Sequence, residues 1–208
     1  MENKNHTKFK SLRTILWILV FLALGFILYQ TNLRARHSIN AGSLQSYQKG
    51  SFTALEVLPN PPSIGAQKFL DKNGKEITLS QIQGKIKVVN IWATWCPPCV
   101  REMPELTQFA ENHKSKGVIV IPISIDKPEE KEKAQKKLNE LSGGKLEFYQ
   151  DPKMELPFAL GVKGFPTTII YDENNKEIAR IPSTPKWDGD EANGLVDLLL
   201  LQSKNIDK

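Results

Sequence analysis

The feature that most constrains the fold is a pair of cysteines placed directly after an apolar run. The chain contains two cysteines, within the sequence Trp95-Cys96-Pro97-Pro98-Cys99, which follows the β-branched and apolar residues 87–92. A strand that delivers Cys-x-x-Cys to the start of a helix is typical of reversible disulfide chemistry. A cross-link between residues so close in sequence constrains little of the unfolded chain. The pair is therefore expected to be chemically active.

Composition allows one globular domain and an additional segment. The chain has 208 residues, of which 40% are hydrophobic and 25% charged, which suits a single domain with its own core. The net charge of +5 and the pI near 9.1 raise the question of nucleic-acid binding. Basic and acidic residues are interleaved, however, and the sequence has no Lys/Arg block with interspersed aromatic residues. We therefore expect no nucleic-acid partner.

The additional segment is N-terminal. Residues 15–29 read ILWILVFLALGFILY without a charge, with Trp17 and Tyr29 near the ends of the run. Such a pattern predicts a single-pass transmembrane signal anchor. At about 1.5 Å per residue the run extends roughly 22 Å, which is short for a bilayer core of about 30 Å unless flanking residues contribute.

A cleaved signal peptide is the alternative to an uncleaved anchor. Residues 29–34 are bulky or polar where a signal peptidase requires small side chains, which favours the anchor. Basic residues are more numerous before the apolar run than after it, so residues 1–14 are expected in the cytoplasm. Residues 30–50 are polar and read as a tether or a continued helix. Either way, a domain at 51–208 is expected outside the cytoplasmic membrane, facing the periplasm or the cell exterior.

Strand and helix patterns alternate through this domain and indicate an α/β layered architecture. Asn73-Gly74 lies between the first two expected strands and predicts a type I′ hairpin turn. Residues 129–141 predict a charged surface helix with a narrow apolar stripe. The other expected strands span 67–71, 76–78, 118–125, 146–149, 167–171 and 177–181, and the other expected helical segments span 79–83, 152–160 and 191–202.

The chemistry expected of the cysteines follows from their positions. Cys96 stands where the strand ends and Cys99 in the first helical turn, so Cys96 is expected to be an exposed nucleophile and Cys99 a buried resolving thiol. A helix dipole and free N–H groups lower the pKa of such a thiol. Because Pro97 and Pro98 lack an N–H, the Cys99 amide is the nearest backbone donor. Modest thiolate stabilisation places the pair toward the reducing end of dithiol couples.

Two other uses of the cysteines remain open. Half of a metal site would need further ligands, and His6, His37 and His113 are scattered in the sequence; a non-enzymatic Cu(I)-binding module is a related alternative. A peroxiredoxin is the weakest alternative. Its Pro-x-x-x-Thr-x-x-Cys pattern is missing, because Thr94 stands two rather than three residues before Cys96. We expect no metal and no prosthetic cofactor.

Two motifs together resemble the thioredoxin superfamily. They are the run from Asn90 to Cys99, with Pro104 beyond it, and Gly164-Phe165-Pro166-Thr167-Thr168. Within the superfamily, residues 51–200 are similar to the membrane-anchored TlpA/ResA branch, and the charged helix and the tail at 182–198 look most like its TlpA group. The resemblance implies a thioredoxin-like α/β fold with a central mixed sheet flanked by helices, an N-terminal β-hairpin extension and an inserted charged helix.

The resemblance also implies a surface that docks substrates. It implies a cis peptide at Phe165-Pro166 facing the disulfide, with backbone groups of Phe165 free to pair with an extended partner. The residues expected to bind substrate are Trp95, Pro97, Pro98, Phe165, Pro166 and Thr167.

Glu102 is the third expected catalytic residue. It follows Cys99 by one helical turn, where a carboxylate can exchange a proton with the resolving thiol, and the TlpA/ResA branch has an acidic residue at the matching position that tunes the cysteine pair. The alternative is a first-turn glutamate that complements the helix dipole.

Other residues of the motifs are expected to have structural roles. Asn90 occupies a position where thioredoxins carry a buried acid, and it is expected to be a hydrogen-bonding core residue. Trp92 is expected in the core, Pro104 is expected to kink the helix, and Trp187 is expected to act as a hydrophobic staple before the last helix.

The resemblance implies a membrane-tethered, extracytoplasmic thiol-disulfide oxidoreductase that reduces protein disulfides. The implied substrates are a copper chaperone, an oxidase subunit or apocytochrome c, and the implied electron donor is a membrane protein of the DsbD/CcdA type. An oxidant of the DsbA type, which would run the same cysteines in reverse, is the alternative.

Overall fold

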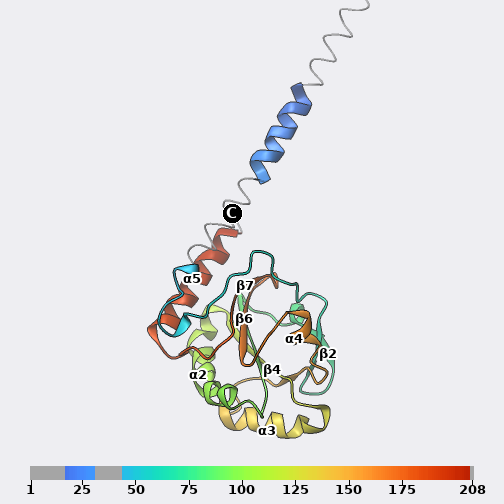
Figure 1. Ribbon diagram of the computed structural model, residues 1–208, viewed down its shortest axis with the longest axis vertical. Helices are drawn as coiled ribbons and strands as arrows, with labels where there is room; N and C mark the ends of the chain where they lie inside the picture. Colours follow the sequence, from blue (N-terminus) through green and yellow to red (C-terminus); the bar gives the residue numbers. More distant parts are fainter. Residues whose placement is uncertain (1–16, 31–43, 207–208) are drawn as a thin grey trace, which may run out of the picture. The chain divides into compact units, whose positions relative to one another are not determined.

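A computed structural model describes residues 17–30 and 44–206 of the chain, which divides into two units, Met1–Ser43 and Leu44–Lys208. In the first unit, residues 17–30 form a helix (Figure 1), and its apolar side chains are exposed. Within the part of the chain that is described, no helix meets the length and hydropathy needed to cross a membrane. The predicted anchor starts at residue 15 and most of the predicted tether follows residue 30, so both extend outside the described residues.

The second unit is built on a seven-stranded mixed sheet in the order β2-β1-β5-β4-β3-β6-β7. The central strand β3 runs parallel to β4 and antiparallel to β6. The strands are β1 (Lys68–Asp71), β2 (Glu76–Thr78), β3 (Ile86–Trp92), β4 (Val118–Ser124), β5 (Tyr149–Gln150), β6 (Thr167–Asp172) and β7 (Glu177–Ile181). The mixed sheet predicted from the resemblance is confirmed.

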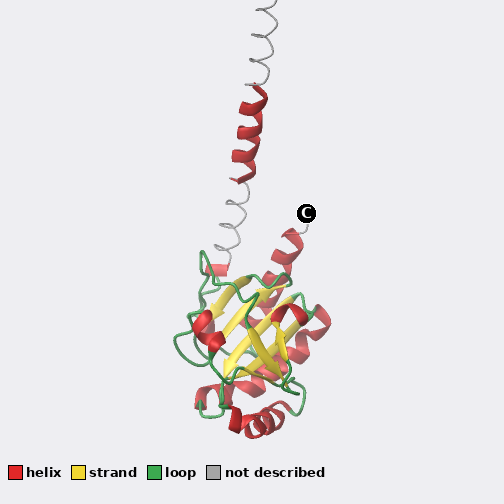
Figure 2. Cartoon of the chain, turned by 90° about the vertical axis from the view of Figure 1, so that its right-hand side faces the viewer, coloured by secondary structure: helices red, strands yellow, loops and turns green. Residues whose placement is uncertain are grey.

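Helices surround this sheet (Figure 2). The last residue of α2, His113, is hydrogen-bonded to Asn193 of α5 at 2.9 Å, and Lys116 of the following 3-10 segment forms an ion pair with Asp197 of α5 at 2.7 Å. The helices are α2 (Pro97–His113), α3 (Lys131–Ser142), α4 (Glu155–Ala159) and α5 (Asp190–Ile206), with short 3-10 segments η1 (Gly50–Phe52), η2 (Leu79–Gln81), η3 (Lys114–Lys116) and η4 (Pro128–Glu130).

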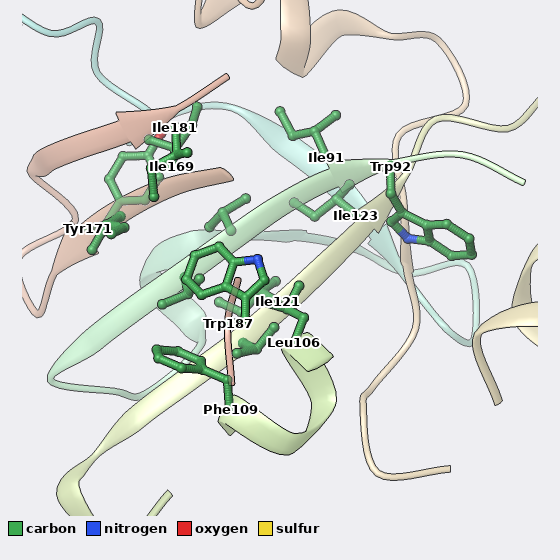
Figure 3. Close-up of a cluster of buried hydrophobic side chains, with 14 of the residues drawn as sticks. Ile91, Trp92, Leu106, Phe109, Ile121, Ile123, Ile169, Tyr171, Ile181 and Trp187 are labelled. Carbon is green, nitrogen blue, oxygen red and sulfur yellow. The ribbon is translucent and has the colours of Figure 1, made fainter. Parts of the chain in front are cut away.

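The core lies on both faces of the central strands. All seven residues of β3 are buried, as expected of a strand covered on both sides. From α2, Leu106 and Phe109 pack toward the sheet, where they gather with Trp187 beside Ile121 (Figure 3). Burial of such apolar surface contributes about 25 cal/mol per Å², so this cluster fixes how α2 sits on β4.

The inserted charged helix is present as η4 and α3. Its apolar stripe is narrow, as predicted, because Ala134 and Leu138 are buried while most of its charged residues are not. The strand expected at 146–149 is wrong in its bounds, since β5 contains Tyr149 and Gln150 alone. Tyr149 and Gln150 pair with β1 on one side and β4 on the other. Leu146 and Phe148, which precede them, are buried by side-chain packing without strand pairing.

The N-terminal β-hairpin is formed by β1 and β2, but the type I′ turn predicted from Asn73-Gly74 is wrong. Such a turn needs positive φ at both central residues, and of these two only Gly74 has it, at 83°. The Asp71 carboxylate accepts hydrogen bonds from the backbone of Asn73, at 2.8 Å, and of Lys75, at 2.9 Å. This Asp side chain stabilises a different turn with a glycine in the left-handed region.

Candidate functional site

The two cysteines lie where β3 passes into α2. Cys96 is the N-cap residue of α2, with extended backbone at φ −101° and ψ 98°, and Pro97 and Pro98 occupy the first helical positions. Proline suits these positions because the first N–H groups of a helix have no partner within it. The predicted arrangement of strand, cysteine pair and helix is confirmed.

The cysteines are joined by a disulfide, with their Cα atoms 5.3 Å apart. Cys99 is fully buried and Cys96 is 5% exposed, so the predicted order of exposure is right. The prediction that Cys96 is openly exposed is wrong, since the exposed surface here belongs to its neighbours Trp95 and Pro97. The Cys99 amide donates to Cys96 Sγ at 3.4 Å. This is the backbone donor that was predicted, because Pro97 and Pro98 have no N–H.

An apolar surface adjoins the disulfide. The Trp95 side chain is 54% exposed, and its ring meets that of Phe165 edge to face with centroids 6.0 Å apart. Thr167 begins β6 opposite Ile91 of β3, so the loop before β6 lies at the end of β3 that leads to the cysteines. The structure thus brings together two segments about 70 residues apart in the sequence, as the resemblance implies.

The residues expected to bind substrate differ in exposure. Trp95 and Pro97 are exposed, and Pro98 and Phe165 are half-buried. Pro166 and Thr167 are buried. The Thr167 hydroxyl donates to the Gly164 carbonyl at 2.7 Å, which holds the loop that carries the cis peptide Phe165-Pro166. The apolar contact surface is therefore formed by Trp95, Pro97 and Phe165.

Glu102 has a buried carboxyl with both oxygens in hydrogen bonds. Asn90 Nδ2 donates to Oε1 at 2.8 Å and Trp187 Nε1 donates to Oε2 at 3.5 Å, and the residue is 4% exposed. Burial raises the pKa of Glu102 to about 7, against the effect of the two N–H donors and with a contribution from the charge of Glu105. A carboxyl that titrates near neutral pH, one helical turn after a cysteine of the pair, is suited to proton transfer.

The alternative in which Glu102 complements the helix dipole is wrong. The first turn of α2 contains no acidic residue, because Glu102 lies in the second turn. It is also withdrawn from solvent, whereas a carboxylate that stabilises a helix start lies within the first turn.

Asn90 is the hydrogen-bonding core residue that was predicted. It is fully buried, and its Nδ2 also donates to Thr168 Oγ1 at 2.9 Å. Its Oδ1 has no hydrogen-bond partner among the residues that are described. An amide at this position cannot exchange a proton near neutral pH, so the titratable group of the site comes from α2 rather than from β3.

Asp126 is a residue of the site that the sequence analysis missed. Its fully buried carboxylate accepts from the Thr94 hydroxyl at 2.6 Å and from the Thr94 backbone N–H at 3.0 Å. The Ser124 hydroxyl donates to the same carboxylate at 2.8 Å. Since Thr94 precedes Cys96 by two residues, Asp126 pins the loop that presents the nucleophile. The signal in the sequence is an acid directly after an apolar strand.

Trp187 is the second residue whose place was missed. It is 1% exposed and contacts the carboxyl of Glu102, 85 residues away in the sequence, so it does more than close the last helix. No cluster of three or more His, Cys, Asp or Glu residues with metal-binding geometry occurs in the described parts of the chain.

Comparison with known proteins gives a consistent result. The Redoxin family model matches residues 52–198. The thiol-disulfide oxidoreductase ResA of Geobacillus thermodenitrificans (strain NG80-2) is 27% identical over 165 residues, covering 79% of this chain and 82% of the relative. ResA of Bacillus subtilis (strain 168) is 25% identical over 173 residues, covering 83% of this chain and 84% of that protein.

Solved structures show the same fold. A crystal structure of a putative thiol:disulfide interchange protein DsbE from Chlorobium tepidum has a TM-score of 0.58 and 25% identity, covering 69% of this chain and 99% of that one. The thioredoxin domain of a thiol-disulfide oxidoreductase from Bacteroides vulgatus has a TM-score of 0.56 and 23% identity, with the same coverage of 69% and 99%.

Proposed function

The chain belongs to the redoxin family and is a thiol-disulfide oxidoreductase with a thioredoxin-like fold, and we propose that it reduces disulfides of partner proteins outside the cytoplasm. The direction rests on how little the fold stabilises a thiolate at Cys96. Its Sγ accepts from a single backbone donor found among the described residues, the Cys99 amide, at 3.4 Å, and Pro97 and Pro98 have no N–H to add. A thiolate that is weakly stabilised is readily converted to the disulfide, which makes the dithiol a reductant.

The reduction proceeds through a mixed disulfide. The Cys96 thiolate attacks one sulfur of the substrate disulfide, so a bond forms between Cys96 and that sulfur and the other substrate sulfur leaves as a thiolate that takes up a proton. The Cys99 thiolate then attacks Cys96 Sγ and releases the second substrate thiolate, which is also protonated. Two electrons pass to the substrate, and the Cys96–Cys99 disulfide found in the structure is the product.

Glu102 supplies the proton transfer that the second attack needs. Cys99 is fully buried, so solvent has poor access to its proton. In its ionised form the Glu102 carboxylate takes the proton of the Cys99 thiol, and in its protonated form it returns that proton to the leaving thiolate. A pKa of about 7, raised by burial, makes both forms available at neutral pH.

Trp95, Pro97 and Phe165 form the platform on which the partner docks. Their exposed apolar area surrounds a Cys96 that is itself 5% exposed, so a partner must lie on this platform for its disulfide to reach the sulfur. An extended segment of the partner would pair with the backbone of Phe165, in the loop before β6, as an added strand.

The setting we propose is the outer face of the cytoplasmic membrane. The uncharged run 15–29, preceded by basic residues, serves as an uncleaved anchor. A copper chaperone, an oxidase subunit or apocytochrome c is the proposed substrate. Because each turnover leaves the enzyme oxidised, a membrane donor of the DsbD/CcdA type must return two electrons and two protons to the cysteine pair.

Trapping of the mixed disulfide tests the proposal. The Cys99→Ser variant, expressed as the full chain, keeps the nucleophile but cannot release its adduct, and we expect disulfide-linked partners in the cell envelope. The matched control is Cys96→Ser, which keeps Cys99 in its buried position and should trap nothing. Absence of any envelope adduct, or a reduction potential well above about −200 mV, would overturn the reductase proposal in favour of Cu(I) binding or of an oxidant.

A further inference from the structure

Trp187 is held along one face of α2. Its indole N–H donates to Glu102 Oε2 at 3.5 Å, and its backbone N–H donates to Glu105 Oε2 at 3.3 Å. Its ring packs edge-on against Phe109, with centroids 5.1 Å apart, as seen beside Leu106 in Figure 3. Residues spaced three, four and seven apart share one face of an α-helix. Trp187 therefore contacts α2 along its length from Glu102 to Phe109.

A second aromatic contact to the indole comes from the segment that enters the domain. The Phe52 ring meets Trp187 at a right angle, 88°, with centroids 5.7 Å apart. Next to it, the backbone N–H and hydroxyl of Ser51 both donate to Glu191 Oε2 in the first turn of α5, at 3.1 and 3.0 Å. Because the indole is buried and contacts both Phe52 and Phe109, close packing restricts it to one rotamer.

We propose that Trp187 is a positioning residue, whose indole N–H holds the Glu102 carboxyl in the orientation that exchanges a proton with Cys99. Asn90 reaches this carboxyl from β3 and Trp187 reaches it from the segment before α5, one at each oxygen. A carboxyl held at both oxygens keeps one orientation relative to the helical turn that carries Cys99. Phenylalanine would fill most of the same space but has no N–H, so packing and positioning can be separated.

The surroundings of the carboxyl define what the indole N–H contributes. Glu105, on the same helix, is the charged group that acts on Glu102, and Cys99 precedes Glu102 by three residues on that helix. The neighbours from β3 and β6, Asn90 and Thr168, are neutral. N–H donors favour the ionised carboxylate and the charge of Glu105 disfavours it. Loss of the indole N–H therefore shifts Glu102 toward its protonated form.

This inference deepens the proposed function and rests on it in one respect: Glu102 must act as the base for Cys99. The step to measure is release of the second thiolate when the reduced full chain, in detergent micelles, reacts with Ellman's reagent. Cys96 forms the mixed disulfide in the first phase, and Cys99 resolves it in a second phase that is independent of reagent concentration. The rate of this second phase should rise with pH as Glu102 ionises.

Trp187→Phe should move this rise toward higher pH by about one unit, so that the second phase is about tenfold slower on the acidic side of the midpoint. Glu102→Gln should abolish the rise, and adding Trp187→Phe to Glu102→Gln should change nothing more. Trp92→Phe is the matched control: Trp92 is fully buried, and its Nε1 has no hydrogen-bond partner in the described residues, so this variant should keep the wild-type midpoint.

The opposite pattern would refute the positioning role. If Trp187→Phe slows the second phase equally at all pH values, and does so in both backgrounds, Trp187 serves packing alone. A titration without turnover separates this failure from failure of the proposed function. In the wild-type chain, the NMR signal of the Trp187 indole N–H should shift with pH at the same midpoint as the Glu102 carboxyl carbon. An indole signal that does not follow Glu102 would overturn the inference even if Ellman's reagent shows normal exchange.

Discussion

Asn90 at the centre of β3 donates a hydrogen bond to Glu102 on α2 across 2.8 Å, and both side chains are buried. The amide on the strand supplies a hydrogen-bond donor and the acid on the helix supplies the titratable group. A single buried acid would combine these two roles. Because the amide cannot ionise near neutral pH, the contact between β3 and α2 contains one buried carboxyl rather than two. Like charges at this separation could not both be accommodated in a buried site.

Asn90→Asp should therefore place two carboxyls in one buried site and force them to share a proton. We expect two apparent pKa values that belong to the pair, one of them above that of wild-type Glu102, and lower stability as the pH rises above 7. Carbon NMR of the carboxyl groups and urea unfolding at several pH values check this. Asn90→Leu, which adds no acid, is the control; an equal loss of stability at every pH in both variants would contradict the prediction.

Glu102→Gln should become more stable than wild type as the pH rises. The folded pKa of Glu102 is raised to about 7 by burial, above its unfolded value of about 4.3. A raised acid pKa gives a stabilisation that is complete below the unfolded pKa and is lost as the pH rises through the folded pKa. The glutamine variant has no such loss. The difference between the two proteins should therefore change by on the order of 3 kcal/mol between pH 4 and pH 8.

Urea unfolding of the oxidised proteins at both pH values measures this difference. Asp151, whose pKa is also raised by burial, is present in both proteins and cancels in the comparison. A stability difference that stays constant with pH would show that Glu102 has an ordinary pKa in the folded chain.

The parts of the fold that sequence could predict are those whose chemistry is local. The buried strand before Cys96, the prolines that start α2 and the loop at Phe165-Pro166 each lie in a short motif, and all are found where they were expected. The Asn73-Gly74 turn failed because the side chain of Asp71, two residues earlier, competes for the same backbone N–H groups.

The contacts that complete the site were beyond prediction for a physical reason. Asp126 and Thr94 are 32 residues apart, and Trp187 and Glu102 are 85 residues apart. Their meeting depends on how β4 and α5 pack around β3 and α2, and no local pattern carries that information. Nothing in the sequence near Asp126 distinguishes it from other acidic residues that follow apolar strands. Only the parallel pairing of β3 with β4 places it beside the loop before Cys96.

Thr94→Val should destabilise the protein by about 1–3 kcal/mol, because the variant keeps the shape of the side chain but removes one donor from the buried Asp126 carboxylate. Chemical unfolding of the oxidised protein measures the loss. Thr107→Val is the matched control, since the Thr107 hydroxyl is also buried but donates to the Met103 carbonyl of its own helix, at 2.7 Å. Comparable small losses in both variants would mean that the Asp126 contact has no special weight.

Trp95→Ala should separate docking from chemistry. The Trp95 side chain is 54% exposed and leans on Phe165, so its loss should cost under about 1 kcal/mol of stability. A small disulfide such as Ellman's reagent needs no platform, and its first-phase rate should stay within about twofold of wild type. Reduction of a protein disulfide such as that of insulin should fall by about tenfold, because a buried aromatic anchor at a protein contact contributes about 1–3 kcal/mol. Leu201→Ala, which removes another apolar side chain that is 60% exposed, on α5, should affect neither rate. If Trp95→Ala slows both substrates equally, Trp95 shapes Cys96 itself rather than the surface on which a partner docks.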